Sequence, residues 1–176
     1  MVEDKAILTA ALAEVDVSLL QVNSLLLPVA EAVLLVPQLA VAEVLGVGEI
    51  NAEALCLDKL NANPHCYGWF NWRDQHIPLL SYTSIYTGHR PSLDKNLKVV
   101  ICNAVFEAAA TGFYALLVSG FPRAVRLSMA AEMLLEGSPC ERQGVQMLVN
   151  IDGEEVLIPD FDFLEQVVCE VVKAKG

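Results

Sequence analysis

Cys66, His65 and His76 are the residues of this chain whose types suit nucleophilic chemistry. An imidazole within hydrogen-bond reach of a thiol lowers the thiol pKa and favours the reactive thiolate. However, Cys66 lies among apolar and aromatic neighbours in the sequence, where a buried thiol behaves as a small hydrophobic group. A cysteine-dependent enzyme using Cys66 is therefore kept only as an alternative hypothesis.

The same three residues, together with Cys56, are of types that bind zinc. A tetrahedral zinc site commonly uses paired C-x-x-C ligands, and no such pair occurs in the sequence. The five cysteines are an odd number and form no disulfide framework. We expect buried free thiols, with no metal and no cofactor.

Acidic residues near the end of the chain resemble the paired carboxylates of acid/base catalysis. Hairpin and helix-cap roles account for each of them, so we interpret them as a solvated acidic face: Asp152, Glu154, Glu155, Asp160 and Asp162. The motifs G-x-S-x-G, G-x-x-x-x-G-K-[ST], G-x-G-x-x-G and H-E-x-x-H do not occur. The sequence therefore predicts recognition rather than catalysis.

Residues 69–78 read WFNWRDQHIP and contain two of the residue types that most often carry binding energy at interfaces. We expect Trp69 and Trp72 to fill the core. We expect Arg73 to lie at a turn beside aromatic surface, where its guanidinium group can meet a carboxylate of a partner protein.

Short apolar runs bounded by proline or polar residues surround this segment, and they are typical of strands. Residues 23–30 and 32–38 fit two such strands, and Pro37 suits the start of a short helix over 37–46 that Gly46 ends. Residues 67–73 alternate as a strand and return, through a turn at Asp74 and Gln75, into a second strand. Pro78 would confine that return strand to a sheet edge or a bulge.

The second half of the chain continues in the same manner. Residues 98–106 and 112–120 are rich in β-forming residues, whereas 127–137 have a helical pattern. Asp152-Gly153 lies between two alternating apolar runs, which predicts a hairpin. Residues 160–175 predict a terminal helix that begins with Asp and ends with Lys.

Composition limits the classes of partner and the compartment. The chain carries 11 basic and 22 acidic residues, a net charge of −11, and such a field repels nucleic acid. Residues 25–47 are apolar, but Pro28, Pro37 and Glu31 oppose a membrane-spanning helix. Glu3 and Asp4 stand where a secretory signal would carry positive charge, so we expect a cytoplasmic protein without direct membrane insertion.

The order of these elements predicts a domain organisation. Many short strands without a regular βαβ alternation favour barrels or a sandwich. We expect an N-terminal arm or helix over 1–22, one domain over 23–168 and a C-terminal tail over 169–176. The polar segment 87–97 is the expected division between two small lobes.

Several segments, taken in order, resemble the CheW-like coupling proteins of bacterial chemosensory arrays. LLVPQLAVAEVL (34–45) is similar to an early family segment, with Val41, Glu43 and Val44 in register. PHCYGWFNWRDQHIPLL (64–80) is similar to the family signature, and FYALLVSGFPRAVRL (113–127) and IDGEEVLIPDFDFLE (151–165) are similar to its later motifs. Asp74 departs from the family, which usually has Gly there. The closest likeness is to the ChpC type of twitching-motility systems.

The resemblance implies a mainly β fold: two five-stranded SH3-like barrels around a shared hydrophobic core, with a short helix after the second strand and a C-terminal helix. It implies a non-catalytic adaptor of two-component signalling, which links the cytoplasmic tip of a chemoreceptor to the regulatory domain of a CheA-type histidine kinase. It places Val41, Glu43 and Arg73 near the groove between the barrels where the receptor docks.

A small-molecule-binding β-barrel is the other alternative, with the aromatic residues lining a pocket. That alternative predicts a closed cavity of several hundred Å³. The adaptor predicts an open groove and exposed apolar edges.

Overall fold

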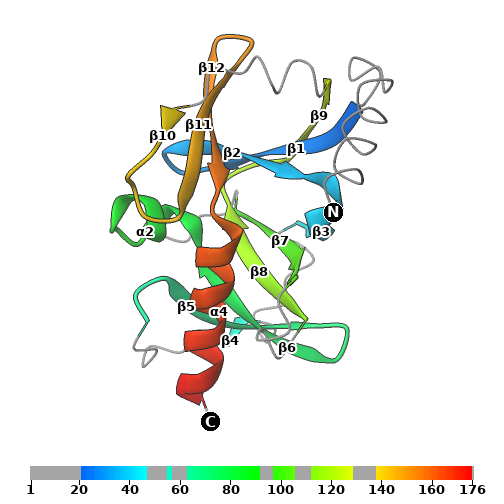
Figure 1. The fold of residues 1–176 in the computed structure, drawn as a ribbon. Coiled ribbons are helices and arrows are strands. Elements are labelled where there is room, and N and C mark those ends of the chain that lie inside the picture. Colours follow the sequence, from blue (N-terminus) through cyan, green and yellow to red (C-terminus); the bar gives the residue numbers. More distant parts are fainter. Residues whose placement is uncertain are drawn as a thin grey trace, which may run out of the picture.

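A computed structural model describes residues 21–46, 55–56, 63–91, 97–105, 112–128 and 138–175. The expected N-terminal arm or helix over 1–22 and the helical pattern over 127–137 lie outside these ranges, except that residues 21–22 and 127–128 are described and belong to strands. The described chain is mainly β and forms two six-stranded sheets, each with five longer strands and one strand of two residues (Figure 1). The prediction of two five-stranded barrel-like lobes is therefore confirmed.

The first sheet has the strand order β10-β11-β12-β2-β1-β9. Its neighbours are antiparallel, except that β12 runs parallel to β2. The bounds are β1 (Gln21–Val29), β2 (Ala32–Pro37), β9 (Arg123–Ser128), β10 (Ser138–Pro139), β11 (Val145–Ile151) and β12 (Glu154–Pro159).

The second sheet has the strand order β3-β7-β8-β6-β5-β4, and only its β6–β8 pair is parallel. Its bounds are β3 (Val41–Leu45), β4 (Leu55–Cys56), β5 (Cys66–Trp72), β6 (Gln75–Ser81), β7 (Lys98–Asn103) and β8 (Phe113–Val118).

The chain passes between the two sheets twice in the described part, after β2 and again after β8. The first sheet therefore takes its strands from the beginning and the end of the strand order along the chain, and the second sheet takes the strands between them. Residues 87–97, where we expected the lobes to divide, instead connect β6 and β7 within the second sheet. The lobes are assembled by pairing between distant strands, which a change in local composition does not reveal.

The segment after β2 corrects the predicted helix over 37–46. Only the 3-10 helix η2 (Gln38–Ala40) forms there, and the following residues are strand β3. Val41 pairs with Cys102 and Val44 with Val100 of β7, so backbone bonds to a distant strand replace local helical bonds. The expected short helix after the second strand is present, but it ends six residues earlier.

Two α-helices complete the described fold. Helix α2 (Tyr82–Thr87) begins at Ser81, whose side chain accepts a hydrogen bond from the Ser84 N–H, and ends at left-handed Gly88. Helix α4 (Phe161–Lys175) begins where the Asp160 carboxylate accepts the Phe163 N–H at 3.0 Å. The predicted terminal helix is confirmed, and it includes most of the residues assigned to a tail.

A shared hydrophobic core joins the lobes. Residues of β1, β2, β5–β8, β11, β12, α2 and α4 contribute to it, among them Leu27, Trp69, Leu116 and Leu164. Smaller clusters lie within each lobe, and Trp72 belongs to that of the second. Both tryptophans are buried, as predicted. No helix among the described residues has the length and apolar character that a membrane span needs.

Two hairpins turn through residues with positive φ. Asp152 and Gly153 form the predicted turn between β11 and β12, with φ of 53° and 87°. Arg73 and Asp74 form the β5–β6 turn, with φ of 46° and 61°, one residue earlier than expected. Positive φ at both central residues is the geometry of a type I′ turn. Strand β6 is interior rather than an edge, and its pairing with β8 begins at Leu79, just after Pro78.

Candidate partner-binding surface

A carboxylate on β3 joins the tip of the β5–β6 hairpin. The Trp72 indole N–H donates to Glu43 Oε2 at 2.8 Å, and Arg73 Nη2 lies 3.1 Å from the same oxygen. Strands β3 and β5 are not neighbours in the sheet. The contact therefore brings together two strands on opposite sides of the sheet order, and the sheet must curl to allow it.

Arg73 is held in place by the aromatic ring beneath it. Its guanidinium carbon lies 4.7 Å from the Trp72 ring centroid, within the range of a cation–π contact. The Trp72 ring packs edge-on against Phe113, with 4.9 Å between centroids. The Trp72 residue is 7% exposed, whereas the Arg73 side chain is 70% exposed. The guanidinium group is thus fixed by buried neighbours while facing solvent.

The structure brings two of the three predicted site residues together. Glu43 and Arg73 form an ion pair, whereas Val41 lies at the start of β3, beyond a register irregularity, and packs partly against the shared core. Trp72, predicted only as a core residue, also supplies a hydrogen bond to the cluster. Two features of the sequence could have indicated this role of Trp72: its position next to Arg73, and its indole N–H, which usually finds a hydrogen-bond acceptor when the ring is buried.

Val41 lines an open groove between the lobes. One hollow of about 740 Å³ lies among Gln21, Val22 and Asn23 of β1 and residues Pro37, Gln38, Leu39, Val41 and Asn103. A second hollow of about 370 Å³ shares three of these residues and continues to Ala40, Val105, Phe161, Asp162 and Glu165. We call the two hollows together the inter-lobe groove.

Exposed apolar side chains stand on fixed backbone in this groove. Leu39 is 91% exposed and Val105 is 77% exposed. The Asn103 side chain donates to the Leu39 carbonyl at 2.8 Å, and buried Glu165 accepts the Val105 N–H at 2.8 Å. The groove is open, as the adaptor predicts, and its smaller hollow is mostly apolar, whereas Gln21, Asn23, Gln38 and Asn103 make the larger hollow partly polar. The small-molecule alternative requires an enclosed cavity.

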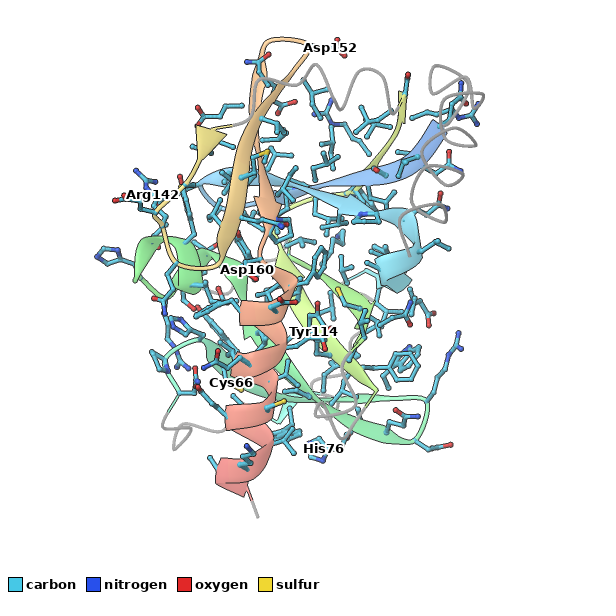
Figure 2. All side chains as sticks on the ribbon, viewed as in Figure 1. Cys66, His76, Tyr114, Arg142, Asp152 and Asp160 are labelled. Carbon is cyan, nitrogen blue, oxygen red and sulfur yellow. The ribbon has the colours of Figure 1, made fainter. Side chains whose placement is uncertain are left out.

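The environment of Cys66 contradicts its proposed role as a nucleophile. Cys66 is fully buried, and its thiol donates to the Gly68 carbonyl at 3.2 Å. The His65 ring lies 3.4 Å from the Ser84 hydroxyl, and the His76 ring packs edge-on against Trp69. Figure 2 shows Cys66 and His76 in separate parts of the second lobe. Burial also raises the pKa of the Cys102 thiol to about 12, so it is neutral at physiological pH.

Of the five acidic residues near the end of the chain, two have the hairpin and helix-cap roles that the sequence predicts, and a third forms an ion pair. Asp152 lies in the hairpin turn, Asp160 caps α4, and Glu154 pairs with Arg123 at 2.7 Å. Within the described ranges, no three residues of His, Cys, Asp or Glu are grouped as metal ligands.

Two SH3-like, barrel-like lobes on a shared core, with a groove between them, define the class of this protein: a double-barrel fold with an open binding surface. The family model for the CheW-like domain matches residues 23–167. The chain belongs to the CheW-like domain family.

A solved structure supports the fold. The scaffolding protein TtCheW from Thermoanaerobacter tengcongensis superposes with a TM-score of 0.61 at 15% sequence identity, covering 80% of this chain and 90% of that chain. At this identity the likeness concerns the fold alone. No curated protein sequence matches this chain.

Proposed function

We propose that this chain is a non-catalytic adaptor that couples the cytoplasmic tip of a chemoreceptor to the regulatory domain of a CheA-type histidine kinase. Membership of the CheW-like family supports a role in a chemosensory pathway. The observation that carries the proposal is the inter-lobe groove, where Leu39 and Val105 stand exposed in a setting that nearby hydrogen bonds hold fixed.

The inter-lobe groove suits a helical partner. An amphipathic helix places apolar side chains on one face, and an apolar groove accepts that face. Val41 lines the groove, and Glu43 lies two residues further along the same strand with Arg73 paired to it. The apolar groove thus supplies contact area, while the exposed guanidinium group adds charge complementarity and fixes the register of the partner.

The particular pathway is part of the proposal. The likeness of LLVPQLAVAEVL and IPDFDFLEQ to the ChpC type favours a twitching-motility system. The receptor tip and the kinase of such a system both lie in the cytoplasm, and we place this adaptor there. Residues 23–168 form the working unit, with Val41, Glu43 and Arg73 on the receptor side.

Arg73→Glu tests the receptor side of the proposal. We expect it to abolish pull-down of a chemoreceptor cytoplasmic fragment, because the exposed positive charge is reversed. The thermal unfolding midpoint should change little, since a solvent-exposed ion pair contributes only about 0–1 kcal/mol. Arg123→Glu is the matched control, because Arg123 is an exposed arginine on β9 that also pairs with a carboxylate, Glu154, and it does not line the groove. Equal receptor binding by Arg73→Glu and the wild type would contradict the assignment.

Leu39→Asp tests the groove itself. Leu39 is almost fully exposed, so the substitution should leave folding unchanged while it removes the receptor fragment from the pull-down. Binding of the kinase regulatory domain, measured in parallel, should persist if the two partners use separate surfaces. Unchanged receptor binding would show that the groove is not the docking site.

A further inference from the structure

Helix α2 lies on the side of the molecule away from β3 (Figure 1), and Arg142 and Arg90 lie close to it, on Tyr86 and just after its end. We call this the α2 surface and define it by Tyr86, His89, Arg90 and Arg142. We propose that the α2 surface binds an acidic segment of a partner protein, through carboxylates that engage Arg142 and Arg90. This inference does not depend on the proposed adaptor function, since it concerns a surface separate from the inter-lobe groove.

Arg142 is the exposed centre of the α2 surface. It lies in the connection between β10 and β11, and its guanidinium carbon is 4.9 Å from the Tyr86 ring centroid. Its Nη1 donates to the Tyr86 hydroxyl. Figure 2 shows Arg142 at the outer edge of the molecule beside α2. One edge of the guanidinium group is thus anchored, which leaves Nε and Nη2 to bind a carboxylate.

Arg90, three residues beyond the end of α2, also stacks on a tyrosine ring. Its guanidinium carbon lies 4.8 Å from the Tyr67 ring centroid. Its Nε donates to the Pro64 carbonyl at 3.0 Å, and its Nη2 donates to the Cys66 carbonyl. These bonds hold its positive charge at a fixed position beside exposed His89.

The backbone beneath these side chains is firmly packed. The Tyr82 hydroxyl donates to the Gly144 carbonyl at 2.7 Å, which ties α2 to the connection that carries Arg142. A Cβ atom added at Gly144 would lie 2.5 Å from Ile85 Cγ2, so the two segments are in close contact. A surface that is already ordered loses little conformational entropy on binding.

The charges around the arginines identify the kind of partner. The arginines of the chain are Arg73, Arg90, Arg123, Arg126 and Arg142. Carboxylates pair with Arg73 and Arg123, but within the described part of the chain no carboxylate lies within 4.0 Å of Arg90, Arg126 or Arg142; Arg126 donates instead to the Asn23 side-chain oxygen at 3.3 Å. Glu141 adjoins Arg142 in the sequence without pairing to it, and Glu170 acts electrostatically on His65 nearby.

Of the three arginines without a carboxylate partner among the described residues, only Arg90 and Arg142 stack on tyrosine rings, in a chain with twice as many acidic as basic residues. A guanidinium group stacked on an aromatic ring offers its remaining N–H groups in the planar arrangement that suits a carboxylate. A long polyanion such as nucleic acid would meet the net charge of −11, and a second copy of this chain would bring the same charge. A short segment of Asp or Glu residues is small enough to contact the α2 surface alone, so it avoids the acidic remainder of the molecule.

A titration of the isotopically labelled full chain with an acetylated octaglutamate peptide, followed by two-dimensional NMR, tests the proposal. We expect saturable shifts centred on residues 86–90 and 142–144, and no such shifts with octaglutamine. Arg142→Gln should weaken binding at least about 5-fold, because it removes a charge-assisted hydrogen bond. Arg126→Gln, which removes an exposed arginine outside the surface, should bind as the wild type does. Arg142→Lys, which keeps the charge but loses the planar group, should bind with intermediate affinity.

Several results would overturn the proposal. They are shifts centred elsewhere, equal binding by Arg142→Gln and the wild type, or equal shifts with octaglutamine. Tighter binding of a thymidine oligonucleotide than of octaglutamate would identify nucleic acid as the occupant instead. Concentration-dependent dimerisation that Arg142→Gln abolishes would identify a second copy of the chain.

Discussion

Arg73 and Arg142 both stack on aromatic rings, and they differ in the polar group that each contacts. The guanidinium carbons lie 4.7 Å and 4.9 Å from the centroids of Trp72 and Tyr86. Arg73 also pairs with Glu43, whereas Arg142 donates to the Tyr86 hydroxyl and has no carboxylate within 4.0 Å among the described residues. The ring therefore fixes the position of each cation, and the neighbouring carboxylate decides how much of its charge is already balanced.

The two arginines also differ in how the backbone beneath them is held. Arg73 has a φ of 46° in a two-residue turn, so the residue that carries the guanidinium group also has the positive φ. Arg142 precedes Gly144, which takes up the positive φ and packs on Ile85. The first arrangement depends on a cross-strand hydrogen bond, and the second depends on close packing.

Gly144→Ala should have the largest effect, and it tests the packing beneath Arg142. The added Cβ would lie 2.5 Å from buried Ile85, at a φ of 74° that disfavours an L-residue. Left-handed geometry costs about 1–2 kcal/mol, and overpacking of a core costs about 1–3 kcal/mol more. We expect the free energy of unfolding, measured by urea denaturation, to fall by about 2–5 kcal/mol.

Gly153→Ala is the matched control for this prediction. Gly153 also has positive φ, but no atom lies within 4 Å of an added Cβ. Only the backbone cost of about 1–2 kcal/mol should appear there. Equal losses at the two positions would show that close packing does not secure the α2 surface.

A pair of Glu43 variants should have a smaller effect and separate the two roles of that carboxylate. Glu43→Leu leaves the nearly buried Trp72 N–H without its acceptor, which should lower the free energy of unfolding by about 1–3 kcal/mol. Glu43→Gln keeps an acceptor oxygen and loses only the exposed ion pair, so its cost should stay below about 1 kcal/mol. Equal costs in chemical denaturation would mean that the indole hydrogen bond does not organise the hairpin tip.

Asp74→Gly should have the smallest effect, and it should be stabilising. Asp74 has a φ of 61° at the second central position of a type I′ turn, where glycine is preferred. We expect a gain of up to about 1 kcal/mol in the free energy of unfolding. Asp74→Ala removes the same carboxylate without relieving the backbone, so it should destabilise. A gain from both variants would attribute the effect to charge rather than to φ.

Local patterns predicted the elements whose signals are local. The Asp152-Gly153 turn, the terminal helix capped by Asp160 and the apolar strands on either side of Ala30 all follow from short-range preferences, and all are present. The prediction of a helix over 37–46 was wrong because it also relied on local preferences alone. Its apolar and acidic residues suit a helix by themselves, but pairing of β3 with β7 supplies backbone bonds that the local pattern does not show.

The contacts among the candidate site residues were not predictable from the sequence. The resemblance places Glu43 and Arg73 near one groove, but it does not show that one carboxylate oxygen serves both Arg73 and the Trp72 N–H. Leu39 and Val105 drew no attention as single aliphatic residues, because their exposure is visible only once the inter-lobe groove has formed.

The sequence by itself determined that this protein is mainly β, strongly acidic and without the common catalytic signatures, since these properties depend on composition, alternation and short motifs. Only the tertiary structure decided that the chain passes from the first sheet to the second and back, and that Cys66 is buried. It also decided that two ring-stacked arginines have no carboxylate partner within the described residues. Strand pairing, burial and ion pairing join residues far apart in the chain, so their outcome is settled by the packing of the whole domain.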